Sequence, residues 1–143
     1  MKDSQKKDIQ DTTFDIKKTV DYWVESATYD FETGKVLIKS KRYPYALFFG
    51  HLALEKILKA LIVKATGQHA PYSHSLTFLA DKTTIEIPET TMDRLAEYIE
   101  FHIESRYPDE NREFYNKCSK EFTILKYNEI EEVCNWLTKK LEM

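Results

Sequence analysis

The segment from Tyr45 to Gly67 limits the fold of this chain more than any other part of the sequence. Placed on a helix, it is apolar over more than half of its circumference, and its prominent apolar residues are Leu47, Leu54, Ile57, Leu58, Leu61 and Ile62. A helix that is apolar on most of its sides must be surrounded by other elements. Pro44 suits its first turn, and Gly67 suits its C-terminal end. The segment therefore predicts the central helix of a bundle.

Two further helices are expected next to this segment. The first begins at Ile16 and ends near residues 39–44, where Pro44 disfavours helical geometry at the preceding residue. Its apolar or small residues are spaced three and four apart, as one helix face requires: Val20, Trp23, Ala27, Phe31, Gly34 and Ile38. A short helix follows Ser73, which suits an N-terminal cap, and turns Leu76, Leu79 and Ala80 inward.

Two more helices are expected in the second half of the chain. One begins at Pro88 and is interrupted at Pro108, and its buried stripe is Met92, Leu95, Ala96, Ile99 and Ile103. After the polar run "DENREFYNK", the last helix extends from about Ser119 to Leu141. The chain of 143 residues contains only three glycines and four prolines, too few for the many turns of an all-β protein. We therefore expect an all-α fold, an up-and-down four-helix bundle with one additional short helix.

The length of the chain predicts one domain. Residues 1–12 are polar and are interpreted as a flexible N-terminal arm, and residues 13–143 as the helical bundle domain. No apolar run follows the lysines of the N-terminus, and no long apolar stretch is present, so we expect a cytoplasmic protein without a membrane contact. Cys118 and Cys134 lack the spacing of a zinc site and are expected to be free thiols.

The charge pattern argues against nonspecific binding of DNA. The formal net charge is -3, and neither half of the chain is strongly basic. On the helix that begins at Pro88, Asp93, Glu97, Glu100 and Glu104 recur four, three and four residues apart. An acidic row of this kind repels a phosphate backbone.

The stretch "SRYPDENREF", residues 105–114, contains the densest group of candidate binding residues. Arg106 and Arg112 present guanidinium groups that suit phosphate or carboxylate, and Asp109 is placed to orient one of them. Tyr107 is a candidate for stacking on a base. In the structural alternative, Pro108 ends the helix, Tyr107 packs inward, and Asp109 caps the next turn or pairs with Arg112.

Charged and imidazole side chains elsewhere suggest further candidates. Glu55 and Lys59 have the spacing of a helical ion pair, which either orients the central helix or leaves Lys59 facing a ligand. His74 at a helix start either donates to a backbone carbonyl or faces a cleft. The four histidines show no paired ligand spacing, so we expect no metal and no cofactor. No catalytic triad or glycine-rich phosphate loop is present in the order of residues.

Several stretches in the same order resemble the HEPN (higher eukaryotes and prokaryotes nucleotide-binding) domain over about residues 17–141. They are "YALFFGHLALEKILKALI", then "SHSL" and then "RYPD". The resemblance implies a helical bundle that usually pairs as a homodimer and is often associated with a small nucleotidyltransferase partner or a toxin–antitoxin pair. It also implies that the matched residues lie near a polar cleft: Lys59, His74, Arg106, Tyr107 and Asp109.

The chain departs from the nuclease members of this family at one motif. In those members, an arginine is followed by a histidine after four to six intervening residues. Arg106 and Arg112 have no histidine downstream, Arg42 precedes His51 by eight intervening residues, and Arg94 precedes His102 by seven. We therefore expect no catalytic residue and no ribonuclease activity by that mechanism.

Three functions are compatible with these sequence features. The first is a binding module for a nucleotide or phosphate-bearing ligand, or for a nucleotidyltransferase partner, which acts through Arg106, Tyr107, Asp109 and Lys59. The second is a divergent, metal-independent ribonuclease toxin that brings His74 or His102 to Arg106 across the bundle. The third is a noncatalytic dimeric scaffold, which the abundance of tyrosine favours.

Overall fold

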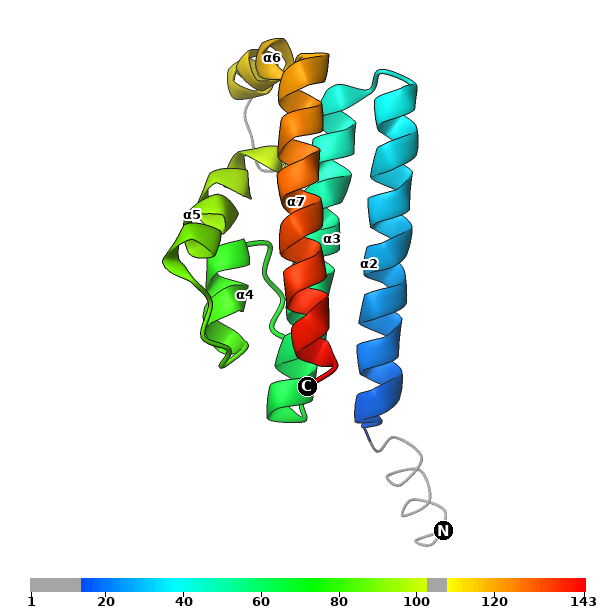
Figure 1. Cartoon of the computed structure of the whole chain (residues 1–143), viewed down its shortest axis with the longest axis vertical. Coiled ribbons are helices and arrows are strands. Elements are labelled where there is room, and N and C mark those ends of the chain that lie inside the picture. The colour runs from blue at the N-terminus through cyan, green and yellow to red at the C-terminus, as the bar shows by residue number, and fades with distance from the viewer. Residues whose placement is uncertain (1–13, 103–107) are drawn as a thin grey trace, which may run out of the picture.

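A computed structural model describes residues 14–102 and 108–143 of the chain, with side chains up to residue 102 and again from residue 111. Within these ranges the chain is all-α and contains no strand (Figure 1). Its elements are α2 (Ile16–Lys39), α3 (Tyr43–Thr66), α4 (Leu76–Lys82), α5 (Glu89–Glu97), the 3-10 helix η1 (Tyr98–Phe101), α6 (Pro108–Lys117) and α7 (Lys120–Leu141). The predicted fold class is therefore confirmed, whereas the flexible arm at residues 1–12 lies outside the described residues.

Helix α3 is the centre of the bundle. The long helices α2 and α7 run beside it, and α4 and α5 pack on the side away from α2 (Figure 1). Leu47, Leu54 and Leu58 of α3 are fully buried, and so are Ala53, Ala60 and Val63 on its opposite side. The sequence prediction that this helix is surrounded is confirmed.

The helix ends follow local chemistry. Asp15 caps α2 by accepting a hydrogen bond from the Lys18 backbone N–H at 3.0 Å. Helix α3 ends at Gly67, which adopts a left-handed backbone with a φ of 68° that glycine tolerates without strain. The cap of α4 is Ser75, which accepts from the Phe78 N–H at 3.2 Å. The prediction of Ser73 as this cap was wrong, because the Ser73 hydroxyl instead accepts from the Ser75 N–H.

The long helix predicted from Pro88 to Pro108 is shorter in the structure. Helix α5 ends at Glu97 and tightens into η1, in which Tyr98 and Phe101 are both fully buried. Side chains three residues apart are eclipsed in a 3-10 helix, so this geometry points both rings to the core. Ile99, predicted to be buried, is exposed as a result.

The polar run predicted to be an interruption is helix α6 in the structure. Phe114 of this helix is buried, and its ring lies 5.8 Å from that of Phe101. One apolar anchor therefore holds an otherwise polar helix against the end of η1. Neither Cys118 nor Cys134 forms a disulfide, as predicted, and both are buried. None of the helices within the described ranges is both long and apolar enough to cross a membrane.

Candidate functional site

Five polar side chains gather on one side of α3, and we call them the histidine cluster: His51, Glu55, Lys59, His74 and His102. The first three recur every four residues and therefore share one face of α3. His74 lies in the linker between α3 and α4, and His102 directly follows η1. Three segments of the chain thus build the cluster.

The Glu55 carboxylate lies at the centre of the cluster. Its side chain is buried, and its two oxygens face different partners. Oε2 accepts a hydrogen bond from Lys59 Nζ at 3.1 Å, whereas Oε1 lies 3.0 Å from His74 Nδ1 and 3.8 Å from His51 Nδ1. A buried carboxylate needs such partners, because an unpaired buried ion is strongly unfavourable.

Three imidazole rings surround this carboxylate. The ring centroid of His102 lies 4.4 Å from that of His74 and 5.1 Å from that of His51. His51 and His102 are buried, whereas the His74 side chain is 44% exposed. The cluster therefore reaches the molecular surface at His74.

Aromatic side chains form the rim of the cluster. Lys59 Nζ lies 5.2 Å from the ring centroid of Trp23 in α2 and 6.0 Å from that of Tyr72 in the α3–α4 linker. Tyr72 is 82% exposed and meets the ring of His74 edge-on at 5.4 Å. The Lys59 ammonium thus has a carboxylate and two aromatic rings as neighbours, an arrangement that stabilises the cation inside the protein.

Three members of the cluster are residue types that ligate metal ions, and they lie close together. Glu55, His74 and His102 each offer one ligand atom, and these atoms all lie within 4.8 Å of one another. No local spacing in the sequence predicted this grouping, because the three ligands come from three separate segments. The local signal in the sequence was the spacing of His51, Glu55 and Lys59 along one helix face. His51 was nevertheless not among the site residues predicted from the sequence.

The remaining site residues predicted from the sequence lie in or beside the segment that the structure does not describe in full. Arg106 and Tyr107 lie outside the described residues, as does the side chain of Asp109. Arg112 is exposed on α6, and no contact recorded among the described residues connects it to the cluster. The structure therefore brings together Lys59, His74 and His102, of which His102 was named only for the ribonuclease alternative, and it adds His51. The role of the arginines stays a prediction.

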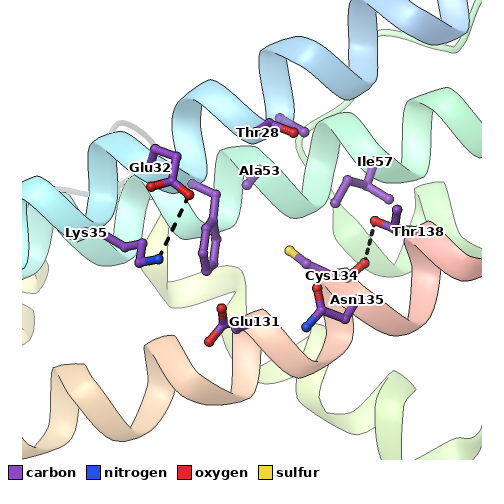
Figure 2. A pocket seen from close by; sticks show the side chains of 11 residues that line it. Thr28, Glu32, Lys35, Ala53, Ile57, Glu131, Cys134, Asn135 and Thr138 are labelled. Atoms are coloured by element: carbon purple, nitrogen blue, oxygen red, sulfur yellow. Dashed lines mark hydrogen bonds and ion pairs between the residues drawn. The ribbon is translucent and has the colours of Figure 1, made fainter.

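A second hollow lies on the other side of α3, between α2 and α7 (Figure 2). Its volume is about 280 Å³, and Phe31, Ile57 and Cys134 are among the side chains that line it. Glu32 and Lys35 form an ion pair of 3.9 Å at its edge. Burial raises the pKa of the Cys134 thiol to about 12, so the thiol stays protonated and is a poor nucleophile near neutral pH.

The chain is similar to known proteins in sequence pattern and in fold. A family model described as the HEPN domain matches residues 20–141, which is most of the chain. A crystal structure of TT1696 from Thermus thermophilus is similar with a TM-score of 0.71 and 20% sequence identity, over 85% of this chain and 97% of that one. No curated protein matches significantly. The structural similarity concerns the fold alone.

Proposed function

The chain belongs to the HEPN domain family, and on that premise we propose that it is a binding module for a nucleotide or another phosphate-bearing ligand, without nuclease activity. The observation that carries the proposal is that the histidine cluster reaches the surface at His74, beside the exposed ring of Tyr72. This arrangement places an imidazole and an aromatic face together where a ligand has access.

Each part of this opening suits one part of a nucleotide. The ring of His74 offers a hydrogen-bond donor to a phosphate, and the ring of Tyr72 offers a face for a base. Lys59 is mostly buried and already paired with Glu55, so its part is to hold the carboxylate in place. Arg106 follows His102 by a few residues in the sequence and is the guanidinium that we assign to the phosphate.

The absence of nuclease activity is proposed from the motif pattern. No arginine in the chain precedes a histidine by four to six intervening residues. The ligand is accordingly bound and not cleaved.

Calorimetric titration with adenine and guanine nucleotides tests the proposal. Base stacking on an aromatic side chain contributes about 1–3 kcal/mol, so Tyr72→Ala should weaken binding roughly 5- to 150-fold. His74→Ala and Arg106→Ala should also weaken binding. His69→Ala is the matched control, because His69 is an exposed histidine of the same linker outside the cluster, and it should bind as the native chain does. If no nucleotide gives heat, the ligand proposal is refuted.

A divergent, metal-independent ribonuclease toxin is a second candidate, and one observation favours it. His74 lies 3.0 Å from the Glu55 carboxylate and its ring packs at a tilt against that of His102, which is the arrangement of a histidine oriented by a carboxylate for acid–base work. For this candidate, we expect the chain to cleave RNA in the presence of a chelator. His74→Ala should lower the rate of cleavage by about 10²-fold or more. Uncleaved RNA excludes it.

Partners are proposed on the basis of the family and the surface. We propose a cytoplasmic homodimer that also associates with a small nucleotidyltransferase, in a toxin–antitoxin pair or a similar complex. Tyr22, Tyr29 and Val36 are exposed and recur every seven residues, so they form an apolar stripe along α2 that suits contact with a second copy. Light scattering should give twice the chain mass of 17.0 kDa, and Tyr29→Glu should give a single chain. A native mass near one chain contradicts the dimer.

A further inference from the structure

We propose that the histidine cluster binds a divalent transition-metal ion such as Zn²⁺ through Glu55, His74 and His102. The proposal rests on the ligand set itself and does not require the nucleotide proposed above. It adds the buried Glu55 and His102 to the site, and it shares the half-exposed His74 with the nucleotide proposal.

The ligand types select the class of ion. Two imidazole nitrogens and one carboxylate oxygen lie within 4.8 Å of one another. Imidazole suits zinc, copper and nickel, whereas magnesium prefers oxygen ligands and retains its water. Two histidines and one glutamate form a known three-ligand set for zinc that leaves a position open. The set therefore favours Zn²⁺ over Mg²⁺.

The geometry requires one modest adjustment. Ligand atoms about 2.0–2.1 Å from a tetrahedral Zn²⁺ are roughly 3.3 Å apart. The three atoms of the cluster lie within 4.8 Å of one another, so the set must contract to hold the ion. Glu55 and His102 are buried and held by packing, whereas His74 is half-exposed on a linker. His74 Nδ1 already lies 3.0 Å from Glu55 Oε1, so the remaining adjustment brings this pair and the His102 ring closer together.

The Lys59 ammonium repels a bound cation but does not block the site. Its ammonium is bonded to Oε2 of Glu55, whereas Oε1 is the oxygen that faces His74 and His51. An ion can therefore bind Oε1 while Lys59 stays on Oε2. Because two positive charges on one carboxylate repel each other, Lys59→Met should bind Zn²⁺ more tightly than the native chain.

His51 is placed to orient the ligands. Its Nδ1 lies 3.8 Å from Glu55 Oε1, and its ring lies 5.1 Å from that of His102. Groups that contact the ligands of a metal commonly change its affinity by about 10- to 100-fold. We assign His51 this positioning role.

The experiment is a titration of the chelator-treated full chain with Zn²⁺ and, separately, with Co²⁺ and Mg²⁺. We expect one Zn²⁺ per chain by calorimetry, visible ligand-field absorption with Co²⁺, and no heat with Mg²⁺. His74→Ala and His102→Gln should weaken Zn²⁺ binding by at least about 100-fold, since loss of a ligand exceeds loss of a group that orients one. His69→Ala should bind as the native chain does. Circular dichroism checks the fold of His102→Gln, and His74→Ala carries the test if that buried substitution unfolds the chain.

Two results would overturn the proposal. One is the absence of stoichiometric Zn²⁺ binding by the native chain. The other is equal Zn²⁺ affinity of His74→Ala and the native chain, which would place any bound ion elsewhere. Nucleotide titration of the chelator-treated protein is a separate measurement, and Lys59→Met distinguishes the two proposals because only the metal should bind more tightly.

Discussion

The two sides of α3 differ in how far their charged side chains are exposed to solvent. On one side, the histidine cluster buries Glu55 and Lys59, whose side chains are 5% and 11% exposed. On the other side, the edge of the hollow between α2 and α7 carries Glu32 and Lys35, whose side chains are 62% and 49% exposed. Both pairs have the spacing of an acid followed by a base on a helix, so the sequence signal is nearly the same.

This comparison shows that spacing along a helix does not set the energy of an ion pair. An exposed pair is screened by water and contributes little. In a buried pair, each charge depends on the other, because neither can regain its hydration without opening the core. The surroundings of each pair, which depend on the packing of other segments, therefore decide what its removal costs.

The largest effect is expected from Glu55→Ala. This substitution leaves the buried Lys59 ammonium without its carboxylate and should lower the free energy of unfolding by about 3–5 kcal/mol. Glu32→Ala is the control in the hollow and should change it by less than about 0.5 kcal/mol. Urea denaturation with a chelator present measures both. Similar losses in the two variants would remove the distinction between the two sides.

The next effect tests the close approach of α2 and α7 near the hollow. A Cβ added to Gly34 would overlap the Tyr127 hydroxyl oxygen. That hydroxyl donates to the Phe31 carbonyl at 2.5 Å, and its ring stacks on the ring of Phe31, so it cannot move freely. Overpacking typically costs about 1–3 kcal/mol, which exceeds the gain of roughly 1 kcal/mol in helix propensity from glycine to alanine. Gly34→Ala should therefore be destabilised.

The double variant Gly34→Ala/Tyr127→Phe sharpens this expectation. Removing the hydroxyl removes the nearest atom but leaves Tyr127 Cζ at 2.7 Å from the added Cβ. Adding Gly34→Ala to the Tyr127→Phe variant should thus lower the free energy of unfolding by less than it does in the native chain, but the loss should not disappear. Thermal unfolding measures this difference. A Gly34→Ala variant as stable as the native chain would show that relieving the overlap costs no more than the roughly 1 kcal/mol gained in helix propensity.

A smaller effect concerns Cys134 in the hollow. Burial raises the pKa of its thiol to about 12 in the folded chain, above the ordinary value of about 8.5. Stability from this group is fully present below about pH 8.5 and is lost as the pH rises toward 12. In that range, the free energy of unfolding should fall with pH in both proteins. The slope for the native chain should be steeper than that for Cys134→Ala by about 1.4 kcal/mol per pH unit.

The comparison of slopes avoids two complications. Cys134→Ala leaves a small cavity and lowers stability at every pH, but this offset does not change the slope. Burial also raises the pKa of Tyr98, and this group adds the same pH dependence to both proteins. Parallel curves above about pH 9 would mean that the thiol is hydrated in the folded chain.

Sequence patterns predicted the parts of the fold that depend on neighbouring residues. The apolar surface of residues 45–67 predicted the buried central helix, and Gly67 its end. The break after Glu97 was not predicted, because the stripe beyond it is compatible with a regular helix. Only the burial of both Tyr98 and Phe101 in the folded core favours the tighter turn.

The candidate site was predictable only in part for a similar reason. Glu55 and Lys59 are close in sequence, so their pairing could be expected from one helix turn. His74 and His102 come near Glu55 only because the α3–α4 linker and the end of η1 pack on the same face of α3. A rule based on ligand spacing cannot find three ligands that lie on three segments.

The smallest expected effect isolates the interaction within each pair. A double-mutant cycle of Glu32→Ala and Lys35→Ala should give a coupling energy of about 0.2–0.5 kcal/mol that weakens further in high salt, because water and ions screen an exposed pair. The same cycle on Glu55 and Lys59 should give a larger coupling with little dependence on salt, since each single variant leaves a buried charge alone. Equal couplings would mean that the Lys59 ammonium reaches water once Glu55 is removed, and the cluster would then be open enough to admit solvent beside the carboxylate.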